Sequence, residues 1–286
     1  MVPRHASTVV VLREGAAGLE VFTVLRHAKS SFLGGAVVFP GGKVDASDED
    51  AGWAAQANAP QPRAEALVAG YGDEAPSPAP SARALAVAAC RETLEEARIL
   101  PLDAPIGDAE VEALRVALAA SPGSLAASLA RLGRKLALDA LVPWARWVTP
   151  EAEARRFDAR FFLLELPEGQ VGRHDEHETT MSSWERPATL LERSLRGEIF
   201  LAPPTTRTLE QLAACPDLRA ARALATEQSL LPVCPIFVPG DDAPYLALPG
   251  DPAHAIRERR ISGPTRFVLR DGRFFSEAPP RGGETT

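Results

Sequence analysis

Two runs of apolar and β-branched residues open the chain, and their spacing predicts a β-hairpin. Ser7–Arg13 and Glu20–Arg26 are rich in valine, threonine and leucine, and a glycine-containing turn over 14–19 separates them. A third apolar run, Ala36–Phe39, stops at Pro40–Gly42. Because proline cannot donate to a sheet ladder and glycine frees the backbone, we expect this strand to end in a sharply turned loop.

A segment without periodic pattern then separates these strands from a series of helices. Residues 48–80 are rich in alanine, proline, glycine and acidic residues, which predicts a surface insertion. Apolar residues recur at helical spacing over Ala82–Ile99, before the stop at Pro101. Two further alanine- and leucine-rich helices are expected over Asp108–Ala120 and Ser124–Leu136.

The second half of the chain alternates between strand and helix patterns. Strands are expected over Val142–Thr149, Ala159–Glu165 and Thr179–Glu185, and helices from near Pro187 and near Thr205. Short strand patterns return from 232 to 275, with a hairpin at Asp271 and Gly272, and we expect them to extend the main sheet. The whole pattern is that of an α/β protein.

Composition narrows the class of protein. The chain has 286 residues, of which 45% are hydrophobic and 24% charged, and we expect one domain with a flexible tail over 277–286. The net charge of −7 argues against nucleic acid or an anionic membrane as a partner. Three cysteines without a CxxC pair indicate a reducing cytoplasm, and no apolar stretch is long enough to span a bilayer. The sequence leaves a homodimer open.

The helix over Ala82–Ile99 carries the clearest chemical signal. At about 100° per residue, Glu92, Glu95 and Glu96 fall on one face, here called the acidic stripe. Three such carboxylates repel one another unless a cation lies between them, and their oxygens suit a hard divalent cation such as Mg²⁺. Arg91 can orient a carboxylate through paired hydrogen bonds. Taken alone, the motif is more typical of a solvated helix face.

The preceding glycine turn changes that balance. Phe39-Pro40-Gly41-Gly42 followed by Arg91-Glu92-Thr93-Leu94-Glu95-Glu96 resembles the box of the Nudix hydrolases. The resemblance implies the Nudix fold, an α/β/α sandwich around a mixed β-sheet, here with a helical and β extension over 187–275.

The same resemblance implies metal-dependent hydrolysis of a diphosphate bond. Mg²⁺ or Mn²⁺ is then held by the acidic stripe (Glu92, Glu95 and Glu96) with the backbone of Gly42. Glu92 is either a metal ligand or the base that takes a proton from water, and Arg91 fixes its orientation. These assignments come from the family and not from spacing.

The box departs from the family pattern in two respects. Between its glycine and its arginine this chain has 48 residues, against about 13 in the family, so residues 48–80 form an insertion within the box. The earlier glutamate of the box, eight residues before its arginine, falls on Arg83, and the closing glycine falls on Arg98. We expect Asp45 or the insertion to supply the missing carboxylate.

One branch of the superfamily, which is related to the peroxisomal coenzyme A diphosphatases of animals, has such an insertion. This chain is similar to that branch at Phe32-Leu33-Gly34, at Arg156–Phe162 and at Leu201–Thr205. The similarity implies a substrate in which a nucleoside diphosphate is linked to another moiety, with coenzyme A or an acyl derivative as the candidate. Of the motif for coenzyme A, Arg26 fits the first basic position, whereas Ser31 stands at the second.

A small phosphate-bearing substrate agrees with the local charge. From 21 to 44 the chain holds Arg26, Lys29 and Lys43 and no acidic residue, which predicts a basic approach to the backbone of Gly41. The second hypothesis is a Nudix-fold module with weak catalysis, which binds nucleotides or has a regulatory role. The complete acidic stripe favours the enzyme.

A second acidic cluster, His174-Asp175-Glu176-His177-Glu178, precedes the strand expected from Thr179. Glu176 is a candidate for a last metal ligand and Glu178 for a catalytic base. A charged surface turn explains the cluster equally well. A zinc site through the two histidines is a third interpretation, but further ligands at zinc spacing are not evident.

Overall fold

A mixed β-sheet forms the centre of the protein. The computed structural model describes residues 2–28, 34–69, 79–175 and 179–280. The strands of the main sheet are β1 (Arg4–Gly15), β2 (Gly18–Arg26), β3 (Val37–Val38), β4 (Gly41–Lys43), β5 (Val142–Val148), β6 (Phe157–Glu165) and β7 (Thr179–Glu185). They run in the order β3-β2-β1-β6-β5, while β4 pairs with β1 and β7 with β2. Only β1 and β6 pair in parallel, so the sheet is mixed as expected.

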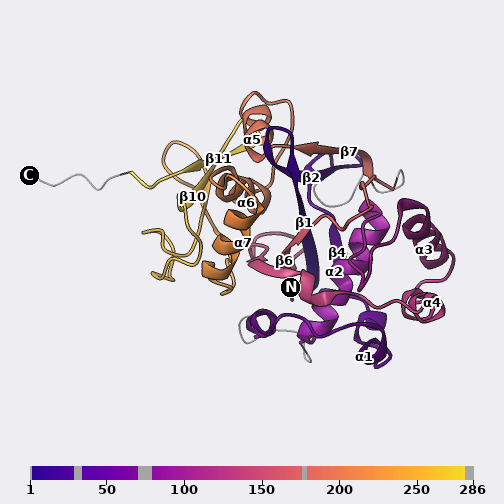
Figure 1. Cartoon of the computed structure of the whole chain (residues 1–286). Coiled ribbons are helices and arrows are strands. Elements are labelled where there is room, and N and C mark those ends of the chain that lie inside the picture. The colour runs from indigo at the N-terminus through magenta and orange to yellow at the C-terminus, as the bar shows by residue number, and fades with distance from the viewer. Residues whose placement is uncertain (1, 29–33, 70–78, 176–178, 281–286) are drawn as a thin grey trace, which may run out of the picture.

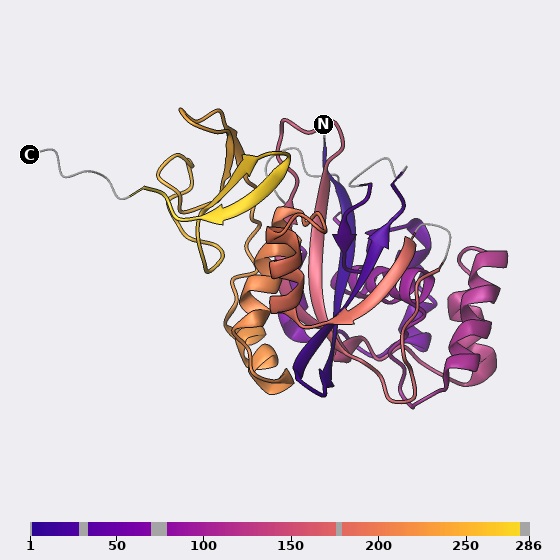
Figure 2. The same ribbon diagram turned by 90° about the horizontal axis from the view of Figure 1, so that it is seen from above.

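Helices cover both faces of this sheet. They are α1 (Trp53–Gln56), α2 (Ala82–Ala97), α3 (Asp108–Ala120), α4 (Leu125–Leu132), α5 (Pro187–Leu195), α6 (Pro203–Ala213) and α7 (Leu218–Glu227). Successive side chains of β1 alternate between two buried cores: Val9 and Val11 pack with α1 to α4, and Val10 and Leu12 with α5 to α7. Figures 1 and 2 show the helices on the two sides. The predicted α/β/α sandwich is thereby confirmed. None of the described helices is long and apolar enough to cross a membrane.

The insertion differs from the surface segment that the sequence predicts. Its described part contains α1, the 3₁₀ helix η2 (Pro62–Leu67) and the end of a second 3₁₀ helix, η1 (Ala46–Glu49). Trp53 and Leu67 are buried in the core under α2. A few apolar anchors spaced among proline, glycine and acidic residues leave no periodic signal, so the sequence did not reveal them.

The expectation that the chain after 232 extends the main sheet is wrong. Strands β8 (Ile236–Val238), β9 (Tyr245–Ala247), β10 (Arg266–Arg270) and β11 (Arg273–Glu277) form a separate four-stranded sheet in the order β11-β10-β9-β8. Each strand pairs with its neighbour in sequence, as in the hairpin at Asp271 and Gly272, where φ angles of 49° and 72° suit a tight turn. Phe267 packs into the core shared with α6, so this sheet leans on the α6 side.

Helix α2 ends in a left-handed residue, Arg98, at the position of the closing glycine of the box. Its φ of 56° and ψ of 40° lie in a region that glycine enters at little cost. Arg98→Gly should therefore raise the free energy of unfolding, measured in urea, by about 0.5–1 kcal/mol. The partly exposed ion pair of Arg98 with Glu112, at 3.4 Å, offsets little of this gain. Arg98→Ala loses the ion pair and keeps the strain, so it should not stabilise; a loss of stability in Arg98→Gly would contradict the interpretation.

Candidate functional site

Helix α2 is fixed to the sheet and to the start of the insertion. The hydroxyl of Ser7 in β1 donates to the carbonyl of Leu85 at 2.7 Å. At the N-terminus of α2, the Ser81 side chain accepts a hydrogen bond from the N–H of Ala84 at 3.1 Å and so caps the helix. The N–H of Ser81 in turn donates to the Glu49 carboxylate at 2.7 Å. The position of the acidic stripe is thus set by both elements.

The glycines after Pro40 lie in strand β4 rather than in the turned loop that the sequence predicts. Proline lacks only its own N–H, and its carbonyl accepts from the N–H of Val9 at 2.9 Å, so the chain remains beside β1. A Cβ on Gly41 would lie 2.4 Å from the carbonyl oxygen of Ser7, so only glycine allows this approach. The Gly41 N–H donates to Oε2 of Glu96 at 3.0 Å and connects β4 to the acidic stripe.

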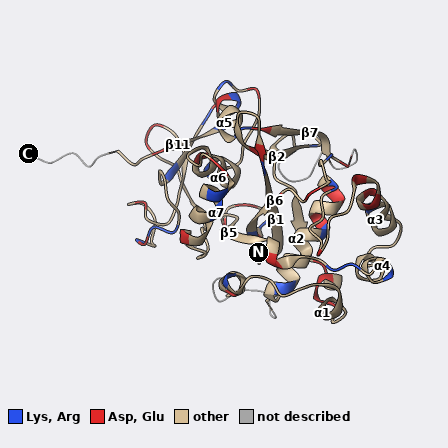
Figure 3. Cartoon of the chain, in the orientation of Figure 1, with Lys and Arg blue, Asp and Glu red and all other residues tan. Residues whose placement is uncertain are grey.

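The Arg91 guanidinium joins the surrounding carboxylates, and acidic and basic positions lie next to each other along α2 (Figure 3). Its Nε and Nη2 donate to the two carboxylate oxygens of Asp48 at 2.9 and 3.0 Å. Its Nη1 donates to Glu92 and to Glu95, each at 2.9 Å, and Nη2 also donates to the Lys43 carbonyl at 2.8 Å. Burial lowers the pKa of Arg91, but the hydrogen bonds and charges of these carboxylates outweigh it and hold that pKa above its usual range.

The three glutamates of the acidic stripe have different surroundings. Burial raises the pKa of Glu92 to about 7, against the opposing influence of Arg91. Glu95 is 38% exposed, and burial raises its pKa as well. Glu96 is buried against β4. The raised pKa of Glu92 marks a carboxylate whose charge a bound cation would compensate.

The donor set fits a hard divalent cation. Glu92, Glu95 and Glu96 offer only oxygen ligands, which Mg²⁺ and Mn²⁺ prefer. Gly42 has no side chain to fill the space beside Glu92, since a Cβ there would lie 2.4 Å from the Glu92 carboxyl carbon. Across the described residues no three acidic, histidine or cysteine side chains form a closed metal cage, and here Arg91 bridges two members of the stripe. These residues could hold a cation once Glu95 is released from that bridge, with the hydrogen bond from Arg91 to Glu92 kept.

Gly42→Ala should impair activity with little loss of stability. The new Cβ would lie 2.4–2.5 Å from carboxyl atoms of Glu92, the far end of a flexible side chain, so Glu92 moves and the backbone need not. A displacement of about 1 Å at a reacting centre costs about 10²-fold in rate. We expect kcat to fall by that factor and the free energy of unfolding to change by less than about 1 kcal/mol. Gly107→Ala, whose Cβ has no atom closer than 3.9 Å, is the control; an unchanged kcat in Gly42→Ala contradicts the prediction.

Mg²⁺ should stabilise the protein more at about pH 8 than at about pH 5.5. The pKa of Glu92 lies at about 7 in the folded state, above its ordinary 4.5. Glu92 therefore contributes most to the stability of the metal-free protein below pH 4.5, and this contribution is lost as the pH rises through 7. A cation binds the deprotonated carboxylate, so its effect grows over the same window. Thermal unfolding with and without Mg²⁺ at the two pH values measures this stabilisation. Glu92→Gln should remove the difference between about pH 5.5 and about pH 8. Equal shifts of the unfolding temperature at both pH values in the wild-type protein would contradict the prediction.

Asp48, the first residue of the insertion, is an acidic residue that the sequence did not single out by number. Counted forward from Gly42, the first carboxylate of the family box stands six residues on, at Asp48; counted back from the arginine, it falls on Arg83. Asp48 is 1% exposed and binds Arg91, whereas the other candidate, Asp45, is 55% exposed and lies 3.7 Å from Arg91. The spacing from the glycine was the available signal, because Asp48 is the first residue of the insertion and the added residues come after it.

Of the remaining predicted residues, Arg26 and Lys43 lie within the described part of the chain. Arg26 ends β2, and its Nε is buried without a hydrogen-bond partner among the described residues. The Lys43 side chain is exposed, and only its carbonyl binds Arg91. Lys29, Glu176 and Glu178 lie outside the described residues.

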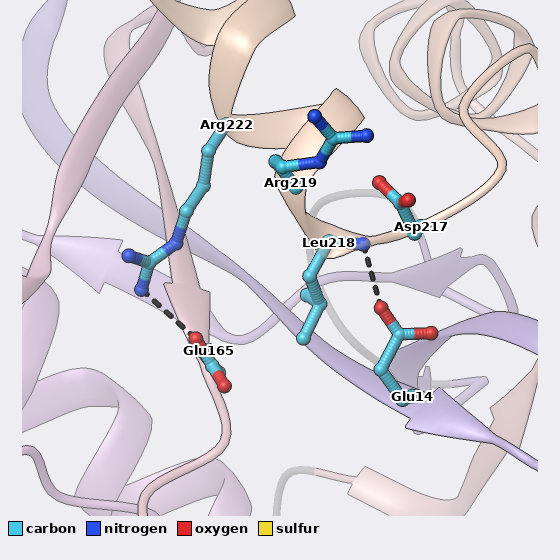
Figure 4. Close-up of a pocket in the computed structure, with 6 residues that line it drawn as sticks. All are labelled: Glu14, Glu165, Asp217, Leu218, Arg219 and Arg222. Carbon is cyan, nitrogen blue, oxygen red and sulfur yellow. Dashed lines mark hydrogen bonds and ion pairs between the residues drawn. The ribbon is translucent and has the colours of Figure 1, made fainter.

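A cavity of about 450 Å³ lies elsewhere and is not the site (Figure 4). It adjoins Glu14, seven residues along β1 from the strand segment beside Gly42, or about 23 Å at 3.3 Å per residue. Two of its carboxylates are already bound: Glu165 by Arg222 at 3.0 Å, and Glu14 by the N–H of Leu218 at 2.7 Å. Asp217 caps the helix that starts there. The cavity thus marks where α7 meets the sheet.

Comparison with known proteins agrees with this geometry. The family model described as the NUDT19 Nudix domain matches residues 4–212. A relative from Gallus gallus named acyl-coenzyme A diphosphatase NUDT19 is 28% identical over 277 residues, which cover 83% of this chain and 73% of the relative. The protein of the same name from Homo sapiens is 29% identical over 274 residues, covering 82% and 72%. A crystal structure of a NUDIX hydrolase from Alicyclobacillus acidocaldarius has a TM-score of 0.63 and 31% identity, and covers 78% of this chain and 97% of its own.

Proposed function

The chain belongs to the NUDT19 Nudix domain family and is a Nudix hydrolase, and we propose that it hydrolyses the diphosphate of coenzyme A or of an acyl-coenzyme A. The observation that carries the proposal is the complete acidic stripe, bound at Glu92 and Glu95 by one buried arginine. The names of the two acyl-coenzyme A diphosphatase relatives support the substrate class.

Nudix hydrolases use divalent metal ions, and for this chain we propose Mg²⁺ or Mn²⁺ held by Glu92, Glu95, Glu96 and the Gly42 backbone. When bound there, such an ion would neutralise phosphoryl charge and lower the pKa of water. Glu176 is proposed as a further ligand, from its place in the sequence.

Proton transfer is the second task of the site. Where it does not bind the metal, Glu92 is the group that takes a proton from the attacking water. Arg91 fixes the Glu92 carboxylate through the 2.9 Å hydrogen bond from Nη1. The oxygen of water forms a bond to one phosphorus, the bridging P–O bond breaks, and two phosphate monoesters leave. Glu178 remains the other candidate for the base.

Recognition of the substrate is proposed to depend on positive charge near β4. Arg26, Lys29 and Lys43 supply it in a stretch without acidic residues, and the backbone at Gly41 lies beside the acidic stripe. The net charge of −7 supports a small phosphate-bearing substrate over nucleic acid. A cytoplasmic location is proposed from the three cysteines, none of which forms a disulfide.

A substrate panel tests this function. Purified protein with Mg²⁺ or Mn²⁺ is given coenzyme A, an acyl-coenzyme A, ADP-ribose, a dinucleotide and a nucleoside triphosphate. We expect the two coenzyme A compounds to be cleaved with the highest kcat/KM, and mass spectrometry to find phosphopantetheine, or its acyl form, with an adenosine bisphosphate. Preference for another compound would replace the substrate class. Failure with every compound and both metals would favour a non-hydrolysing nucleotide-binding module.

A further inference from the structure

The first turn of the insertion is fastened to α2 at two points. In η1, Asp48 binds the Arg91 guanidinium with both carboxylate oxygens. The next residue, Glu49, accepts hydrogen bonds from the N–H and the hydroxyl of Ser81 at 2.7 and 3.1 Å. The N–H of Asp45 donates to Asp48 at 2.8 Å and closes the turn. A four-residue 3₁₀ helix has few hydrogen bonds of its own, so its position depends on such external contacts.

A buried tryptophan supports this turn from below. Trp53 is 4% exposed, and its indole N–H donates to the carbonyl of Ser47, the residue before Asp48, at 2.9 Å. The carbonyl of Trp53 is in turn bound by Arg83 of α2, whose Nη1 lies 3.4 Å from it and 3.3 Å from the carbonyl of Asn58. These contacts run from α2 through the insertion and back to the same helix.

From these contacts we propose that Trp53 and Arg83 are positioning residues for hydrolysis, an inference that rests on the proposed function. Trp53 holds the backbone before Asp48, and Arg83 holds Trp53. Asp48 then sets the plane of the Arg91 guanidinium, because a two-pronged carboxylate contact has a narrow geometry. That guanidinium orients Glu92. Arg83 stands where the family box, counted back from its arginine, has a glutamate. In this chain that position therefore anchors the insertion.

Trp53→Phe tests the role of the indole N–H, since phenylalanine keeps an aromatic ring in the core and removes the donor. We expect kcat on coenzyme A to fall about tenfold and KM to change less than about twofold, as for a loss of orientation at the reacting group. The matched control is Trp144→Phe. Trp144 is fully buried in the opposite core, where its indole N–H donates to Thr208 at 3.3 Å. This variant should keep kcat within about twofold of wild type. Equal kcat losses in the two variants would overturn the proposal.

A second readout does not require turnover. The Nε–H of Arg91 donates to Asp48 in a buried site, so its hydrogen exchange, followed by ¹⁵N NMR on the metal-free protein, should be slow. Trp53→Phe should speed this exchange at least tenfold, and Trp144→Phe should not. If exchange is faster in Trp53→Phe but the wild-type protein cleaves no substrate, the proposed function is wrong, while the positioning of Arg91 by Trp53 is still supported. Equal exchange in both variants would overturn the positioning, whatever the activity.

Arg83 gives an independent test that does not alter the core. Arg83→Met removes the donor to the two carbonyls of the insertion, whereas Arg83→Lys keeps one. We expect the methionine variant to lower kcat and to speed Arg91 exchange several-fold, and the lysine variant to restore most of both. If Arg83→Met has the same kcat and the same Arg91 hydrogen exchange as the wild-type protein, Arg83 is not a positioning residue. This pair also decides the question if Trp53→Phe does not fold.

Discussion

Glu96→Gln is expected to abolish turnover, with kcat lowered at least about 10³-fold, or about 4 kcal/mol of transition-state stabilisation. The substitution removes the negative charge that the proposed metal site needs. It keeps an oxygen able to accept the Gly41 N–H, which lies 3.0 Å from Glu96 in the native protein. The fold should therefore persist. Initial rates on coenzyme A with Mg²⁺ and thermal unfolding without metal measure the two effects separately.

The control for Glu96→Gln is Glu192→Gln, the same change on the exposed surface of α5. It should leave both rate and stability unchanged. The stabilisation of the folded protein by Mg²⁺ should be weaker in Glu96→Gln and unaltered in Glu192→Gln. Turnover retained in Glu96→Gln would exclude Glu96 from the proposed metal ligands.

Long periodic patterns predicted the framework of the fold. The β1–β2 hairpin, α2 and α3 lie where the sequence places them, and α3 has the expected bounds of Asp108–Ala120. Such segments bury one continuous face, so their hydrophobic period reports directly on the core. The helix expected over 124–136 ends earlier, at Leu132, because Gly133 turns the chain with a φ of 61°.

Short elements escaped prediction because their partners are not encoded locally. The glycine strand β4 exists through its pairing with β1, whereas β3 lies within the strand expected over Ala36–Phe39. The hydrophobic pattern of the strands after 232 is equally compatible with pairing to the main sheet and with a separate sheet. What excludes them from the main sheet is tertiary: α6 lies against them, and Arg207 of α6 donates to the carbonyls of Ser262 and Pro264 at 2.8 and 2.6 Å.

The candidate site was partly readable from the sequence. Helical spacing placed Glu92, Glu95 and Glu96 on one face, and Arg91 is adjacent to them in the chain as well as in space. Asp48 was not singled out because the expected position was counted back from Arg91, across the insertion, and not forward from Gly42. Trp53 had no signal of its own, since its contact with Ser47 is a matter of loop geometry in a segment without a period.

Asp48→Asn should cause the largest combined loss of stability and activity. The amide brings a donor to the guanidinium where the carboxylate offered two acceptors, at 2.9 and 3.0 Å. Removing one partner of a buried ion pair costs about 3–5 kcal/mol, because the remaining charge stays buried. Glu92 and Glu95 still neutralise Arg91 in part, which favours the lower end of that range. The free guanidinium no longer holds Glu92 in place, so kcat should fall about 10²-fold.

Asp158→Asn separates the two effects. Asp158 is buried like Asp48 and accepts from both Nε and Nη2 of one arginine, Arg146, at 2.8 and 2.7 Å. It lies in β6, and its partner lies in β5, so its loss should lower the free energy of unfolding by a similar amount without moving Glu92. Urea unfolding and kcat are compared at a temperature where both variants are folded. If Asp158→Asn lowers kcat as far as Asp48→Asn does, the loss reflects stability alone, and the orienting role of Asp48 fails.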